Sequence, residues 1–200
     1  MPCSTYKASD HRSIKSPTDE SLVELVKKGD DGAFRELMLR YIDQIRGFVR
    51  QYARAPEDTE DIVQDSFFKA WKYIRKFKKG KSWKPWLYAI ARNTALDHVK
   101  KKHAVLFSEL DDDDNDLSFA DTLADTEPLA QELFERRQSA DKLEEVLRIL
   151  HPEHRAIMVM HYHEEMTFDE IAEVVGKPMN TVKSWHRRAL IKLRAKLHRP

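Results

Sequence analysis

The chain has 200 residues, of which 41% are hydrophobic and 34% charged, and its 5 glycines and 8 prolines are too few for a fold of many short strands, so we expect long helices. Cys3 is the only cysteine, which excludes an internal disulfide and makes a cytoplasmic location the expectation. The net charge of +1 conceals a strong segregation of charge along the chain.

Residues 1–17 have no continuous apolar segment, so we expect a disordered tail there, without a signal peptide or membrane insertion. A short helix is predicted to begin after Thr18, because a hydroxyl cap followed by acidic residues suits the exposed amides and the positive end of the helix dipole. Gly29 is expected to end it. The next helix should begin at Asp30 or Asp31. Its apolar stripe consists of Phe34, Leu37, Met38, Tyr41, Ile45, Phe48, Val49 and Tyr52.

Pro56 interrupts this pattern, and residues 57–77 form the next predicted helix. Its expected inward residues are Ile62, Phe67, Phe68, Trp71 and Ile74. A basic loop at 78–84 follows, and Pro85 opens a helix with Trp86, Leu87, Ile90, Thr94 and Val99 as inward residues. With these apolar faces the helices could share one core. Residues 69–102 also contain twelve Lys or Arg and a single acid, which makes this stretch strongly basic.

Between residues 104 and 135 there are eleven acids and no Lys or Arg. Self-repulsion and low apolar content oppose folding, so residues 103–128 are predicted to be an acidic linker. A second helical set is expected from Leu129, with inward candidates Leu133, Leu143, Val146, Leu147 and Leu150. The predicted fold class is therefore all-α, with two small helical domains at 18–102 and 129–200 joined by this linker.

The last forty residues have the pattern of a helix-turn-helix motif. Thr167 and Glu170 match a capping box that starts a short helix, and Gly176 is expected to cap its end. A final helix should begin at Asn180 or Thr181. It carries most of the eight Lys or Arg found after residue 176, a stretch without acids.

From residue 18 to residue 197 the sequence resembles the extracytoplasmic-function (ECF) sigma factors of the sigma-70 family. The segment DIVQDSFFKAW at 61–71 is similar to the family's region 2.2, and WLYAIARN at 86–93 with Leu96 and Asp97 is similar to regions 2.3 to 2.4. Residues 170–189 resemble region 4.2. The resemblance implies a region 2 helical bundle and a region 4 helix-turn-helix. It further implies a non-enzymatic protein without a cofactor, whose partners are core RNA polymerase (the beta-prime coiled coil and the beta flap), promoter DNA and an anti-sigma factor.

The resemblance also implies residue roles. The residues implied for core polymerase binding are Asp61, Gln64, Asp65 and Phe68. Those implied for the minus-ten element are Trp83 and Lys84, for base capture, and Arg92, Asn93, Lys100 and Lys101. Cations follow phosphates while aromatic rings stack on unpaired bases, which is the chemistry that holds a melted strand. Spacing alone also allows Phe68, Trp71, Trp83 and Trp86 to be core residues, and for Trp86 we favour core packing.

On the final helix, Lys183, Ser184, Arg187 and Arg188 lie where the family reads the minus-thirty-five element. Arginine can make paired hydrogen bonds to guanine, and lysine or serine can contact phosphate. The sequence departs from the family at Ala89, Met179, Asn180, Trp185 and His186, so the promoter sequence cannot be copied from relatives.

Two other functions compete with this interpretation. A helix-turn-helix regulator that acts without core polymerase would explain only the C-terminal half, and an adaptor protein would leave both basic segments unexplained. His151, His154, His161 and His163 lie close together, but without paired cysteines or an HExxH pattern we expect no metal site.

Overall fold

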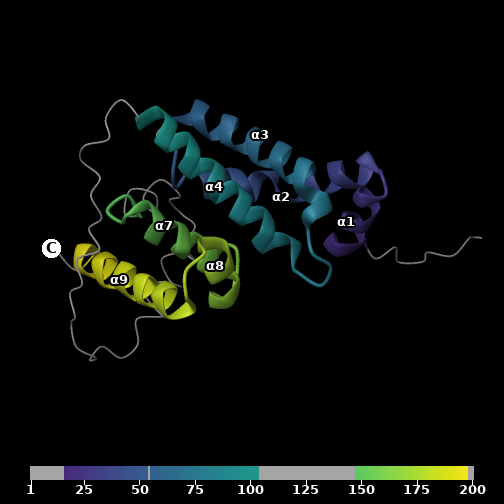
Figure 1. Ribbon diagram of the computed structural model, residues 1–200. Helices are drawn as coiled ribbons and strands as arrows, with labels where there is room; N and C mark the ends of the chain where they lie inside the picture. Colours follow the sequence, from purple (N-terminus) through teal and green to yellow (C-terminus); the bar gives the residue numbers. More distant parts are fainter. Residues whose placement is uncertain (1–15, 54, 104–146, 198–200) are drawn as a thin grey trace, which may run out of the picture.

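The computed structural model describes residues 16–53, 55–103 and 147–197, and every regular element in these ranges is helical (Figure 1). The elements are α1 (Asp19–Lys27), α2 (Asp31–Val49), α3 (Pro56–Tyr73), the 3-10 turn η1 (Ile74–Lys76), α4 (Trp83–His103), α7 (Pro152–Met158), the π-helical turn η2 (Val159–His163), α8 (Phe168–Val175) and α9 (Met179–Leu197). The all-α prediction is confirmed. Most of the predicted tail and linker, and the helical segment expected between Leu129 and Val146, lie outside the described residues.

The local signals for helix ends act as expected. The Thr18 hydroxyl accepts a hydrogen bond from the Ser21 amide at 3.3 Å, and the Asp30 carboxylate accepts one from the Ala33 amide at 3.1 Å. Gly29, with a φ of +98°, makes the turn between α1 and α2 in a conformation that favours glycine. Three boundaries differ from the prediction: α3 stops at residue 73 and tightens into η1, α4 begins two residues before Pro85, and α9 begins at Met179.

The inward face predicted for α3 is partly wrong. Ile62, Phe67 and Ile74 are buried, whereas Phe68 is 59% exposed and Trp71 is 48% exposed. An α-helix turns about 100° per residue, and the buried stripe of α3 runs through the adjacent pairs Ile62–Val63 and Ser66–Phe67 to Ala70. The stripe that contains Phe67 faces the core, and Phe68 falls outside it.

The core of the N-terminal helices is rich in aromatic residues. Trp83 is 1% exposed, and its ring centroid lies 5.8 Å from that of Phe77 and 5.0 Å from that of Trp86. These three rings hold the start of α4 against η1. The basic loop between these elements therefore rests on a fixed aromatic base.

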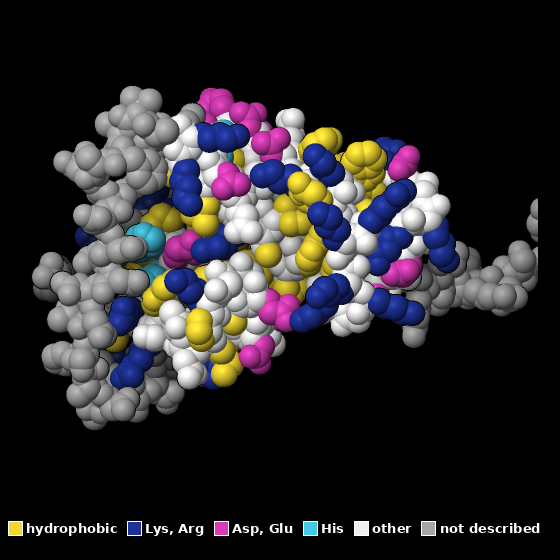
Figure 2. Space-filling model, viewed as in Figure 1, with side chains coloured by type: hydrophobic (Ala, Val, Ile, Leu, Met, Phe, Trp, Pro, Cys, Tyr) yellow, Lys and Arg dark blue, Asp and Glu magenta, His cyan; other side chains and the backbone are white. Residues whose placement is uncertain are grey.

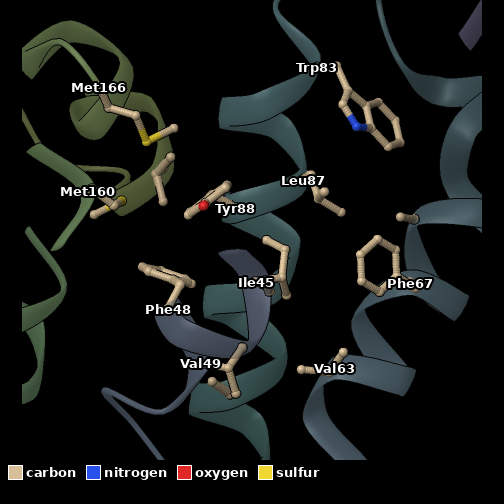
Figure 3. Packing of buried hydrophobic residues seen from close by; sticks show 14 of the residues in the cluster. Ile45, Phe48, Val49, Val63, Phe67, Trp83, Leu87, Tyr88, Met160 and Met166 are labelled. Carbon is tan, nitrogen blue, oxygen red and sulfur yellow. The ribbon is translucent and has the colours of Figure 1, made fainter. Parts of the chain in front are cut away.

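The core continues from the N-terminal helices into the C-terminal ones through the contact of α4 with α8 (Figure 1). In Figure 3, Tyr88 of α4 lies near Phe48 of α2 and faces Met160 and Met166 of the C-terminal part, and all four are buried. A second, smaller cluster joins α7 to α9 through Met158 and its neighbours. In this arrangement the two predicted domains are packed together.

The helix-turn-helix prediction is confirmed in detail. Both bonds of the capping box are present: the Glu170 amide donates to the Thr167 hydroxyl at 3.3 Å, and the Thr167 amide donates to the Glu170 carboxylate at 2.9 Å. Gly176 ends α8 in the left-handed conformation with a φ of +69°. A short turn follows, and α9 begins at Met179.

Among the described residues, no helix combines the length and the apolar composition needed to cross a bilayer.

Candidate polymerase and nucleic-acid interfaces

The four residues expected to bind core polymerase share an exposed face of α3. Asp61, Gln64, Asp65 and Phe68 recur at three- and four-residue steps, and all four are exposed. The Phe68 ring has a neighbour in Trp71, with ring centroids 6.3 Å apart. The alternative that these two aromatic residues are ordinary core is wrong. The face combines carboxylates with an exposed aromatic pair, and aromatic side chains are enriched at protein-binding surfaces.

Basic side chains gather around the end of α3, η1 and the start of α4, with hydrophobic side chains between them (Figure 2). The Lys76 ammonium lies 5.1 Å from the centre of the Tyr73 ring, an example of this mixture. At the other end of α4, Lys100 and Lys101 are exposed, and Asn93 is exposed midway. Three of the residues predicted to bind the minus-ten element are therefore free to reach a ligand.

A pocket of about 250 Å³ opens beside the basic loop. It is lined by Lys76, Phe77, Lys78, Lys81, Ser82, Pro85, Trp86, Ala89 and Glu173. Trp86, assigned to packing from the sequence, is half-buried and forms part of this wall. Trp83 lies behind the wall and presents almost no surface for stacking. Two tryptophans three residues apart on one helix look alike in a sequence, so no local signal distinguished them.

The other predicted minus-ten residues are held by the C-terminal helices. The Lys84 ammonium donates to the Glu164 carbonyl oxygen at 2.6 Å and lies 3.1 Å from its carboxylate. The Arg92 guanidinium makes two bonds to the Glu153 carboxylate, at 2.7 and 3.1 Å. Neither cation is free for another anion in this arrangement.

These contacts perturb the ionisation of the groups around them. Burial alone would lower the pKa of Arg92, but the hydrogen bond and the charge of Glu153 outweigh it and raise the pKa. Burial, followed by the charge of Glu164, raises the pKa of Tyr88 above its ordinary value. The two carboxylates are themselves poorly solvated, since the side chains of Glu153 and Glu164 are 13% and 2% exposed.

The final helix presents the residues expected to read duplex DNA. Lys183, Ser184 and Arg187 are exposed and Arg188 is partly exposed, and their spacing puts them along one side of α9. The Lys183 ammonium lies 5.8 Å from the centre of the Phe168 ring of α8, which orients it from the preceding helix.

Two of the departures from the family pattern turn out to be packing residues. The Trp185 ring lies 5.6 Å from the His154 ring and packs against the core. His186 is 9% exposed, and its Nε2 atom lies 3.0 Å from the Tyr162 hydroxyl. Burial, together with the nearby His161, lowers the pKa of His186 to about 4, so this side chain is neutral at physiological pH.

The clustered histidines have local partners. The Nδ1 atom of His161 lies 3.0 Å from the Met166 carbonyl oxygen, and that of His163 lies 2.8 Å from the Glu164 carboxylate. His151 accepts a hydrogen bond from the Glu153 amide at 3.4 Å. In the part of the chain that the structure describes, no three potential metal ligands come together.

Two family models match the chain, "Sigma-70 region 2" over residues 37–105 and "Sigma-70, region 4" over residues 140–193. The ECF RNA polymerase sigma-E factor of Escherichia coli (strain K12) is 30% identical over 178 residues, which cover 84% of this chain and 87% of that protein. The chain belongs to the ECF sigma factors of the sigma-70 family. This sigma factor is also 29% identical over 172 residues to the RNA polymerase sigma-H factor of Pseudomonas aeruginosa, covering 83% of the chain and 86% of that protein.

The fold of this sigma factor is shared with solved relatives. The sigma factor RpoE of Bartonella quintana, in complex with the anti-sigma factor NepR, superposes with a TM-score of 0.62 at 23% identity, covering 83% of this chain and 98% of that one. As an ECF sigma factor, the protein acts in promoter recognition and transcription initiation. Hereafter region 2 denotes α1 to α4, and region 4 denotes α7 to α9.

Proposed function

We propose that this sigma factor binds core RNA polymerase through α3, opens the minus-ten element with the basic surface of region 2, and reads the minus-thirty-five element with α9. The observation that carries the proposal is the separation of three exposed surfaces on three different elements. An acidic and aromatic face lies on α3, a basic pocket lies between η1 and α4, and a basic face lies on the second helix of a helix-turn-helix.

The face of α3 is the proposed contact with the beta-prime coiled coil of the polymerase. Asp61, Gln64 and Asp65 offer acceptors to a basic or polar helix, and Phe68 offers an apolar anchor beside them. An exposed aromatic residue beside carboxylates loses its contact with water when a partner covers it, which makes it a strong candidate for a binding hot spot.

The pocket beside the basic loop is the proposed site for an unpaired base. Trp86 supplies a ring for stacking, and Lys78 and Lys81 supply cations for the adjoining phosphates. Trp83 supports this wall from beneath, so its predicted part in base capture becomes an indirect one. Asn93, Lys100 and Lys101 are proposed to contact the same strand. Lys84 and Arg92 can do so only when region 4 no longer holds them.

The basic face of α9 is the proposed reader of duplex DNA. A recognition helix places the side chains near its N-terminus against base edges in the major groove. Lys183, Ser184, Arg187 and Arg188 occupy the first half of α9, which agrees with this geometry. Arg188 is the residue proposed to contact a guanine, and the other three fix the register on the backbone.

The remaining parts of the proposal concern partners and organisation. The beta flap of the polymerase is the proposed partner of region 4, and an anti-sigma factor is the proposed inhibitor. We also propose that the protein works without a cofactor, has no enzymatic activity of its own and acts in the cytoplasm. Residues 18–102 and 129–200 are the proposed functional domains, joined by the acidic segment.

The test is reconstitution of transcription from purified components. The full chain is mixed with core polymerase and with templates from its host's genome, and transcripts are mapped with and without the chain. The proposal expects transcripts from discrete start sites that require the chain. Tight sequence-specific binding to duplex DNA without core polymerase, and no new transcripts with it, would instead support a free-standing helix-turn-helix regulator.

A further inference from the structure

One tyrosine of region 2 lies on the surface between two lysines. Tyr73 is the last residue of α3 and is 38% exposed. The Lys76 ammonium lies 5.1 Å from the centre of its ring, and the Lys72 ammonium lies 5.8 Å from it. Both lysines are exposed. The ring is therefore accessible to a ligand, and cations stand beside it.

The other tyrosines of the described ranges are committed to the fold. Three of them make hydrogen bonds through the hydroxyl group and the fourth is buried; they are Tyr41, Tyr52, Tyr162 and Tyr88. Within the described part of the chain, Tyr73 has neither burial nor a hydroxyl hydrogen bond. Packing does not account for this side chain, which favours a role in binding.

Tyr73 lies beside the proposed base pocket and away from the proposed polymerase contact. It follows Phe68 by five positions, which at about 100° per residue places it about 140° around α3. Lys76, which approaches the Tyr73 ring, also lines the pocket. Between Asp65 and Asp97 the chain has nine Lys or Arg and no acid. A strand that leaves the pocket past Lys76 therefore meets the Tyr73 ring on a basic surface.

We propose that Tyr73 is a second stacking platform for the melted strand. It takes the base next to the one held in the pocket, and Lys76 holds the phosphate between the two. Aromatic faces stack on any base, while lysines neutralise phosphates. The inference rests on the proposed binding of the minus-ten strand by region 2.

The lysines beside the ring can be exchanged for a base at a net gain. An exposed contact between a cation and a ring contributes less free energy than the stacking of a base on an aromatic side chain. When a strand arrives, Lys72 and Lys76 can turn to its phosphates and leave the face of Tyr73 to a base. Each of the three side chains then has a stronger partner than before.

The test uses two fluorescein-labelled single-stranded probes with the same backbone. One is an octamer of thymidine, and the other is an octamer of abasic residues that carries the phosphates without the bases. Their binding to the full-length chain is measured by anisotropy, and the ratio of the two dissociation constants gives the preference for bases. We expect Tyr73→Ala to lower this preference about tenfold and to leave the affinity for the abasic probe within about twofold.

Three control variants isolate the ring. Tyr73→Phe should keep the wild-type preference, because the ring face is what stacks. Lys72→Ala with Lys76→Ala should weaken both probes in the same proportion and reduce the salt dependence of binding. Leu39→Ala removes a different exposed apolar side chain, on α2, and should leave both affinities within about twofold.

Several results would overturn the inference. It fails if Tyr73→Ala weakens both probes equally, or if Tyr73→Phe loses as much of the preference as Tyr73→Ala. It also fails if Tyr73→Ala keeps the preference and instead weakens binding to core polymerase, since the ring would then belong to a protein contact. Trp86→Ala, measured with the same probes, tests the proposed pocket separately: a preference that depends on Trp86 and not on Tyr73 refutes the second platform alone.

Discussion

The adjacent residues Phe67 and Phe68 of α3 offer a matched pair of substitutions. They have the same side chain and the same local sequence, yet Phe67 is 5% exposed and Phe68 is 59% exposed. Replacing each by alanine therefore separates the contribution of α3 to folding from its contribution to polymerase binding.

The expected magnitudes follow from these exposures. A phenylalanine side chain buries roughly 200 Å² in a full contact, so Phe68 retains about 120 Å² for a partner, worth about 3 kcal/mol at about 25 cal/mol per Å². Two effects reduce this to about 2 kcal/mol: the ring loses conformational freedom when it binds, and alanine still buries part of the same surface. The affinity of Phe68→Ala for core polymerase should therefore be about thirtyfold weaker. Phe67→Ala should instead cost about 3–5 kcal/mol of folding free energy, because it leaves a cavity.

The affinity is measured by competition with a labelled wild-type chain for core polymerase, and stability by urea unfolding. Phe68→Ala should unfold within about 0.5 kcal/mol of the wild type, as expected for a surface change. The reasoning about α3 fails if Phe68→Ala destabilises the fold as much as Phe67→Ala does. It also fails if Phe68→Ala competes for core polymerase as well as the wild type.

Three further predictions concern region 4. Thr167→Ala removes the capping box of α8 and should lower the free energy of unfolding by about 1 kcal/mol in urea, whereas Thr167→Ser should restore most of it. Arg188→Ala should reduce minus-thirty-five-dependent transcription about tenfold while Lys196→Ala, in the last turn of α9, leaves it nearly unchanged, and equal effects of the two would contradict base reading by Arg188. The pKa of His186 is about 4 in the folded chain against an ordinary value of 6.5, so as the pH falls the unfolded chain binds a proton at this residue before the folded chain does. Stability should therefore fall as the pH drops from about 6.5 to 4, by about 1 kcal/mol at pH 5.5, and His186→Gln should flatten this slope in unfolding measured across that range.

The capped helix ends and the helix-turn-helix were determined by the sequence itself, whereas the end of α3 and the start of α4 were not. Thr18, Asp30 and the Thr167–Glu170 pair act on amides three residues away, and Gly176 acts at its own position. Such signals are complete within one turn of chain, so they hold whatever packs against the helix. The segregated charge likewise indicated basic surfaces before any fold was known, and the family motifs indicated which helices carry them.

Only the tertiary structure decided which side chains face a partner and which face the core. Phe67 and Phe68, like Trp83 and Trp86, differ in exposure because of the helices that pack around them, and composition cannot express that difference. The ion pair between Arg92 and Glu153 depends on the docking of two regions far apart in the chain. Burial and charge pairing are properties of surfaces that meet in space, whereas a helix cap is a property of neighbours in sequence.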